Sequence, residues 1–212
     1  MNILELLPLL PILFLAINGM GLLLVGAFHG NEATKVTCWS CILALLLAAV
    51  ILVKLSWHET IVLHGMFRFD YFTGFMQILI ITGLIASLML SINYLSTAGM
   101  ERFEYPILVV FAGIGMMLMV AASNFLALYM ALELQSLSLY VLAAFMRTST
   151  RSAEAGVKYF ALGAISSGMI LFGISLIYGF TGSLDYGAIT ATMATISTPP
   201  IGITIGLAFL LA

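Results

Sequence analysis

The sequence predicts an all-α polytopic membrane protein, and three observations support this fold class. Of the 212 residues, 63% are hydrophobic and only 8% are charged, whereas roughly a quarter of the residues in soluble domains are charged. The mean hydropathy is +1.19. Apolar stretches of about 20 residues, the length that crosses the hydrocarbon core of a bilayer, recur along the whole chain. These stretches leave no room for a soluble domain, so we expect a helical bundle or part of one.

The first three membrane spans are expected at residues 3–28, 36–55 and 71–94. The N-terminus has neither a basic region nor a small-residue cleavage signal, so it is read as a retained first span rather than a signal peptide. Residues 54–70 form a longer polar connection between the second and third spans. We expect this connection to be a loop.

Three further spans follow. Pro106 is expected to begin the fourth span, because proline fits the first turn of a helix, and this span should end near Ser123. The fifth span is expected at residues 125–146 and the sixth at residues 153–180. Ser152 is a suitable N-cap for the sixth span, since a serine hydroxyl can accept a hydrogen bond from a free N–H of the first turn.

The last part of the chain is less regular. Residues 181–200 are rich in Gly, Thr and Pro and carry little charge, which favours a connector at the membrane interface. Residues 200–212 would make about 20 Å of helix, too short to cross a bilayer comfortably. The sequence is therefore expected to stop inside a seventh span, as a fragment would.

The distribution of basic residues predicts the orientation, because cytoplasmic loops carry an excess of Lys and Arg. With alternating spans, one side holds Lys35, Arg102, Arg147 and Arg151, and the other holds Lys54 and Arg68. This bias places the N-terminus outside and the turn that contains Arg147 and Arg151 in the cytoplasm. A net charge of −2 with scattered basic residues excludes the clustered basic surface that nucleic acid requires.

Metal and redox motifs are weak in this chain. Cys38 and Cys41 have CxxC spacing, but they open a hydrophobic span and no second cysteine pair exists, so packing is the favoured role. The three histidines fall in expected loops without metal-ligand spacing. No bound cofactor or metal is expected in this chain.

One carboxylate interrupts the stretch LYMALELQSLSLYVLAAF. Glu133 lies eight residues after Phe125, about 12 Å into the fifth span. An ionised acid at the centre of a membrane helix costs on the order of 3 kcal/mol, so such residues usually face the bundle interior and often carry ions or protons. Tyr129 and Ser136 fall on the same helical face. The alternative is a protonated, hydrogen-bonded residue that fixes helix packing.

Lys158, in RSAEAGVKYFALGA, is the second candidate for a functional charge. Glu154 stands four residues earlier, in the favourable order for an ion pair, and a lysine near a helix end can reach the interface. Structure and function are therefore equally plausible on position alone. The depths of Glu133 and Lys158 differ by about 10 Å, so no direct ion pair is expected and a link would need water.

The stretches ALELQSLSLYVLAAF and RSAEAGVKYFALGAISSGMILFGISLIYGFTGSL resemble the antiporter-like subunits of bacterial proton-pumping NADH:quinone oxidoreductase, respiratory complex I. These subunits are related to those of multi-component sodium/proton antiporters. The resemblance is specific over residues 128–184. It implies an antiporter-like helical bundle, with helices 1 to 3 in residues 1–104 and the first part of an inverted repeat, helices 4 to 6 and the start of a seventh, in residues 105–212.

The resemblance also implies roles for both charges. Glu133 matches the family's fifth-span glutamate, which belongs to the proton channel, and Lys158 in EAGVKYF matches the family's lysine and becomes an expected channel member. The family places further lysines on its seventh, eighth and twelfth helices. The implied function is proton translocation coupled to electron transfer from NADH to quinone. NADH, FMN, Fe–S clusters and quinone would be bound by partner subunits, and the neighbours would be other membrane-arm subunits.

Two other functions remain open from the sequence. A subunit of a sodium/proton antiporter would share the Glu and Lys pattern without coupling to NADH. A non-catalytic membrane scaffold would use Glu133 only to lock helices together.

Overall fold

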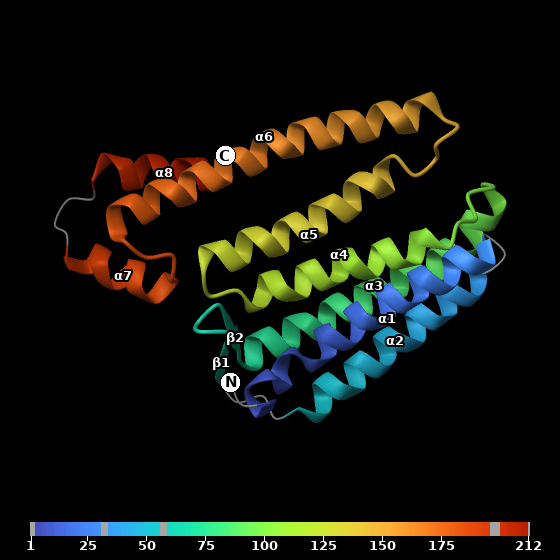
Figure 1. Cartoon of the computed structure of the whole chain (residues 1–212), viewed down its shortest axis with the longest axis horizontal. Coiled ribbons are helices and arrows are strands. Elements are labelled where there is room, and N and C mark those ends of the chain that lie inside the picture. The colour runs from blue at the N-terminus through green and yellow to red at the C-terminus, as the bar shows by residue number, and fades with distance from the viewer. Residues whose placement is uncertain (1–2, 31–33, 56–58, 196–199, 212) are drawn as a thin grey trace.

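The computed structural model describes residues 3–30, 34–55, 59–195 and 200–211. Over these residues the chain is almost entirely helical (Figure 1). In chain order, the elements are η1 (Ile3–Leu9, a 3-10 helix), α1 (Leu10–His29), α2 (Thr34–Lys54), β1 (Thr60–Val62), β2 (Phe67–Phe69), α3 (Tyr71–Thr97), α4 (Glu104–Ala121), α5 (Phe125–Ala143), α6 (Thr150–Thr181), α7 (Tyr186–Thr195) and α8 (Ile201–Leu211).

The predicted fold class is confirmed. Within the described residues, six helices, α1 to α6, are long and apolar enough to cross a membrane, and the first of these spans extends back into η1 to begin at Leu6. They range from 18 residues in α4 to 32 in α6, which brackets the roughly 20 residues that a bilayer requires. The chain is therefore a multi-pass membrane protein.

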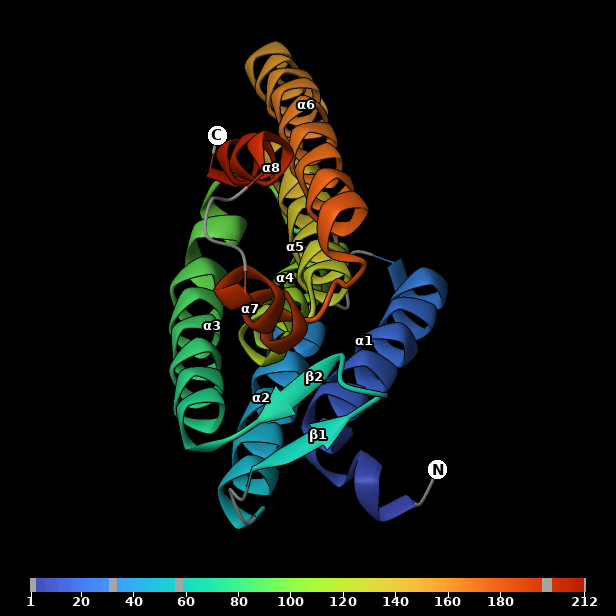
Figure 2. The same ribbon diagram turned by 90° about the vertical axis from the view of Figure 1, so that its left-hand side faces the viewer.

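The core lies around α4. The most apolar 18-residue window of α4 is 56% buried, against 22% in α5 and in α6. Helices α1, α2 and α3 pack with α4 into a bundle, and α5, α6 and α8 extend from it in that order (Figures 1 and 2). Leu45 of α2, Leu88 of α3 and Met117 of α4 are completely enclosed. Helices α5 and α6 consequently present large lipid-facing or partner-facing surfaces.

A two-stranded antiparallel hairpin, β1–β2, occupies most of the connection that we expected to be a loop. Thr60 pairs with Phe69 at one end of the ladder. Val62 and Phe69 are buried against the bundle, while Ile61 is exposed, the alternation typical of a half-buried strand. The Ser123 hydroxyl donates to the Gly65 carbonyl at 2.6 Å and ties the turn to the start of the α4–α5 connection.

Helix α6 begins three residues earlier than expected. Its N-cap is Ser149, whose hydroxyl accepts from the Ser152 N–H at 3.4 Å. The prediction that Ser152 caps the helix was wrong. The Ser152 hydroxyl instead donates to the Ala143 carbonyl at 3.0 Å and accepts from the Met146 N–H at 3.2 Å. It thereby joins the start of α6 to the end of α5.

The connector after α6 contains a helix that the composition did not predict. Asp185 accepts a hydrogen bond from the Ala188 N–H at 2.9 Å in the first turn of α7. Helix α8 then packs on α6, where a Cβ added to Gly173 would lie 2.6 Å from the Gly206 carbonyl oxygen. These glycines let the two backbones touch, as small residues do in membrane bundles.

Candidate functional site

Glu133 lies in the middle of α5. The helix begins at Phe125, directly after an extended break from α4, because the Asn124 side chain accepts from the Leu126 N–H at 2.8 Å and caps a free donor of the first turn. Eight residues at 1.5 Å each place Glu133 about 12 Å from that end. The break between α4 and α5 therefore fixes the depth of the carboxyl in the bilayer.

The Glu133 carboxylate is held between α5 and α6 by hydroxyl groups. The Ser167 hydroxyl of α6 donates to Glu133 Oε1, and Ser167 is buried, with 8% of its surface exposed. Tyr129, one turn earlier on α5, forms a side-chain hydrogen bond with the same carboxylate. The carboxyl thus points toward the adjacent helix. There, two hydroxyls provide the hydrogen bonds that lipid could not provide to an ionised or a protonated carboxyl.

Sequence reasoning identified Glu133 and Tyr129 but missed Ser167. The available signal was the pair Ser166–Ser167 in the middle of a long apolar span, because hydroxyl side chains at such depth usually bond across helices. Nothing in the sequence specifies which of two adjacent serines turns toward α5. Packing decides this, since Ser166 is exposed and Ser167 is buried.

The rest of the α5 surface has an exposed side and a packed side. Leu137 and Val141 are about half exposed, as lipid-facing or partner-facing positions are. Leu134 packs against the hydrophobic core. Tyr140, on the α6 side, makes an edge-to-face ring contact with Tyr159 at 4.9 Å between centroids. Aromatic packing therefore closes the α5–α6 interface on the side of Glu133 nearer the α5–α6 turn.

Two glycines lie where α5 contacts its neighbours. A Cβ added to Gly115 of α4 would lie 2.7 Å from the Gln135 backbone nitrogen and 2.8 Å from the Ala131 carbonyl oxygen. A Cβ added to Gly163 of α6 would lie 1.9 Å from the Tyr140 hydroxyl oxygen. Helix α5 is therefore in close contact with α4 on one side and α6 on the other, and Glu133 lies between them.

Lys158 occupies a different environment. It lies nine residues before Ser167 on α6, which separates the two by about 14 Å along the helix. Its ammonium donates to the Glu154 carboxylate at 2.5 Å, and the two side chains are 70% and 58% exposed. The structure therefore does not bring Lys158 and Glu133 into contact, in agreement with the expected difference in depth.

Glu133 has hydroxyl partners and no cationic one among the residues that the structure describes, where the ion pairs are Arg68–Glu59 and Lys158–Glu154. In the same part of the chain no three His, Cys, Asp or Glu residues come together in a metal-binding arrangement. Cys38 and Cys41 are buried free thiols. A carboxyl bonded to two hydroxyls can accept, hold and release a proton without changing the packing of its helices.

Comparison with known proteins adds a family context. A sequence profile described as the transmembrane region of NADH:quinone oxidoreductases and Mrp antiporters matches residues 122–212, which include α5 and α6. NADH-quinone oxidoreductase subunit N of Parvibaculum lavamentivorans is 46% identical over 98% of this chain, which corresponds to 43% of that protein. The chain thus spans less than half the length of the curated relatives it matches.

Solved structures share the same fold. A chain of respiratory complex I from Thermus thermophilus with bound aureothin superimposes with a TM-score of 0.75 at 28% identity, over 95% of this chain and 42% of that one. A chain of the Mrp complex from Dietzia sp. DQ12-45-1b gives a TM-score of 0.72 at 19% identity, over 100% of this chain and 40% of that one. The latter similarity establishes the fold alone.

Proposed function

This chain is homologous over nearly its whole length to NADH-quinone oxidoreductase subunit N, and from this premise we propose that it serves in proton translocation coupled to electron transfer from NADH to quinone. The chain contributes no redox chemistry of its own. NADH, FMN, Fe–S clusters and quinone would be bound by other subunits. Its neighbours would be the adjoining antiporter-like and small hydrophobic subunits of a membrane arm.

The observation that carries this proposal is the setting of Glu133. Burying an acid in a membrane is expensive, and an apolar residue could fill the same space without that cost. Glu133 instead lies between two helices with the Ser167 and Tyr129 hydroxyls on its carboxylate. We assign it the role of proton acceptor and donor within the bilayer.

Lys158 is proposed as a second member of the same proton path, nearer the α5–α6 turn. Its pairing with Glu154 on an exposed face contributes only about 0.3 to 0.5 kcal/mol to stability, because exposed ion pairs on a helix are weak. The side chain is therefore free to exchange partners. Water would have to bridge the distance from Lys158 to Glu133.

The proposed division of the chain follows the helices. Residues 1–104 contribute the three N-terminal helices, and residues 105–212 form the first part of the antiporter-like unit. In this unit the break between α4 and α5 and the long helix α6 set the position of Glu133. We place the N-terminus in the periplasm and the α5–α6 turn in the cytoplasm of a bacterial inner membrane.

The test is Glu133→Gln in the subunit assembled with its partners in native membranes. We expect normal assembly with reduced proton pumping and reduced quinone-coupled NADH oxidation, because glutamine keeps the shape of the side chain but cannot exchange a proton. Glu101→Gln, in the loop before α4, is the matched control and should pump normally.

Two results would contradict the proposal. Loss of assembly with unchanged activity per assembled complex would assign Glu133 to helix packing. A defect confined to sodium tolerance, with NADH-driven pumping intact, would favour an antiporter subunit, the other function that the matching family includes.

A further inference from the structure

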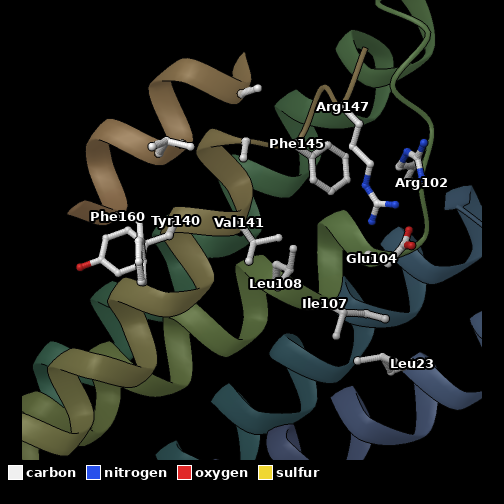
Figure 3. A pocket seen from close by; sticks show the side chains of 14 residues that line it. Leu23, Arg102, Glu104, Ile107, Leu108, Tyr140, Val141, Phe145, Arg147 and Phe160 are labelled. Carbon is white, nitrogen blue, oxygen red and sulfur yellow. The ribbon is translucent and has the colours of Figure 1, made fainter. Parts of the chain in front are cut away.

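A lipid-accessible groove opens at the end of the bundle that carries the α3–α4 and α5–α6 connections (Figure 3). Its volume is about 730 Å³, and its walls come from α1, α4, α5 and α6. Small-ligand sites have volumes of about 300 to 1,000 Å³. Three of its apolar lining residues, Leu23, Val141 and Val157, are 43%, 52% and 69% exposed, so the groove is open from the side.

The groove is apolar along its length and polar at one end. Figure 3 shows Arg102, Glu104 and Arg147 gathered at this polar end, with Tyr140 and Phe160 at the other. Arg102 comes from the α3–α4 connection and Arg147 from the α5–α6 connection. Within the described part of the chain, neither arginine takes part in an ion pair.

Glu104 adds a second polar feature to this end of the groove. Its Oε2 atom is buried and accepts no hydrogen bond from any residue that the structure describes. A buried carboxylate oxygen without a donor is costly, so a donor in the groove would stabilise it once the Glu104 side chain turns this oxygen toward the groove. A ligand here needs an anionic group for the arginines and a hydroxyl or similar donor for Glu104.

The dimensions fit a lipid of the adjoining leaflet. From Ala153 to Phe160, which both line the groove, is seven residues of α6, which corresponds to a depth of about 10 Å. One leaflet contributes half of a hydrocarbon core of roughly 30 Å. The groove can therefore hold the upper part of an acyl chain while the headgroup remains at the level of the two arginines.

We propose that this groove binds one anionic phospholipid with a headgroup hydroxyl, such as phosphatidylglycerol. Its phosphate lies between Arg102 and Arg147, its headgroup hydroxyl donates to Glu104 Oε2, and one acyl chain follows the apolar wall of α5 and α6. Guanidinium groups bind phosphate through several hydrogen bonds at once. Basic pockets between membrane helices are suited to anionic headgroups. This inference does not depend on the function proposed for Glu133.

The test is lipid binding to the full chain, purified with its membrane partners and analysed by native mass spectrometry after exchange into defined lipid. We expect phosphatidylglycerol to be retained and phosphatidylcholine, which is neutral and lacks a headgroup hydroxyl, to be lost. Arg102→Gln or Arg147→Gln should weaken retention of phosphatidylglycerol about fivefold, and the double variant roughly thirtyfold. Arg151→Gln is the matched control, because Arg151 lies nearby in the first turn of α6 but does not line the groove.

Several outcomes would overturn the proposal. Equal retention of the two lipids would show that Arg102 and Arg147 do not form a phosphate site. An effect of Arg151→Gln as large as that of Arg102→Gln or Arg147→Gln would show the same. Equal retention of phosphatidylmethanol, which is anionic but has no headgroup hydroxyl, would remove the assigned contact of Glu104. A photoreactive maleimide on Val157→Cys should cross-link to lipid, and a cross-link to a protein chain would show that a partner helix fills the groove instead. The native cysteines do not interfere, because Cys38 and Cys41 are each only 1% exposed.

Discussion

The contact between Ser167 and Glu133 joins residues 34 positions apart, on two helices connected by a turn at one end of the bundle. A hydrogen bond to a charged group contributes about 1.5 to 3 kcal/mol, more than most neutral bonds. The hydroxyl therefore fixes where the carboxylate points as well as stabilising it. The orientation of the Glu133 carboxyl depends on this one donor and on Tyr129.

We predict that Ser167→Ala lowers the rate of proton translocation while leaving the amount of assembled complex unchanged. Removal of a donor to a charged group should reduce the rate roughly tenfold. Ser167→Thr keeps the hydroxyl and should restore most of the rate. Ser166→Ala is the control, because Ser166 is exposed on the same helix. An equal loss in Ser166→Ala would assign the effect to α6 in general. The measurement is proton pumping in vesicles, normalised to assembled complex.

Among single residues, the sequence identified only those that are unusual at their position in a membrane span or that share a helical face with such a residue. Glu133 was identified because an acid in the middle of an apolar span is expensive, and its position in the span is visible in the sequence. Tyr129 followed from helical spacing on the same element. Ser167 could not be predicted, because its role depends on which face of α6 meets α5. Whether Glu133 and Lys158 carry protons remains a prediction.

At the scale of elements, the start of α3 combines a cap with a titratable group. The Asp70 carboxylate accepts from the Thr73 N–H at 2.8 Å. This backbone hydrogen bond, ahead of a smaller contribution from the charge of Arg68, lowers the pKa of Asp70. Asp70 therefore stabilises the folded chain fully above its unfolded-state pKa of about 3.9. That contribution is lost as the pH falls through the lower folded-state pKa.

We predict that two variants of Asp70 distinguish the effect of its N-cap hydrogen bond on stability from the effect of its negative charge. Asp70→Ala should destabilise the chain by about 1 kcal/mol at neutral pH, because the N-cap acceptor is lost. Asp70→Asn keeps an acceptor, so it should be nearly as stable as the parent, but its stability should fall less steeply on acidification. Thermal unfolding in detergent as a function of pH measures both effects. A parallel acid dependence in Asp70→Asn and the parent would contradict the assigned role.

Helix contacts through glycine give a second prediction for the elements. Gly115→Ala should destabilise the chain by about 1 to 3 kcal/mol, because the added methyl group meets the backbone of α5, which cannot rotate away as a side chain could. Gly83→Ala is the matched control on α3, where the added Cβ meets nothing within 4 Å. Unfolding by heat or denaturant measures the difference. Equal stability of the two variants would mean that α4 and α5 separate at little cost.

Long elements were predictable from the sequence and short ones were not. All six spans follow from apolar length, because the bilayer imposes one requirement on every crossing helix. The hairpin β1–β2 and the helix α7 are too short to cross a membrane, so no such requirement marks them. The hairpin has an alternating pattern in TIV and FRF, but three residues a strand are too few to distinguish a strand from a loop. Packing of Val62 and Phe69 on the bundle stabilises it.

At the scale of the whole molecule, the two ends of the bundle differ in charge. The end of α1, the start of α2, and the α3–α4 and α5–α6 connections lie at one end (Figure 1). The hairpin and the connections between α4 and α5 and between α6 and α7 lie at the other. The end with the α5–α6 turn carries the larger set of basic residues, Lys35, Arg102, Arg147 and Arg151. Under the positive-inside rule we expect this end to face the cytoplasm.

The last prediction tests this orientation with single cysteines. Thr148→Cys lies in the exposed α5–α6 turn, and Met66→Cys lies at the partly exposed turn of the hairpin at the opposite end. A membrane-impermeant maleimide should label Thr148→Cys in inside-out vesicles and Met66→Cys in intact spheroplasts. The reagent reaches only the cytoplasmic side of the chain in the vesicles and only the periplasmic side in the spheroplasts. The parent chain is the control, since its two cysteines are buried within the bundle. The opposite labelling pattern would invert the topology and place Arg147 in the periplasm. The phospholipid proposed for the groove would then belong to the outer leaflet, although its arginine contacts would be unchanged.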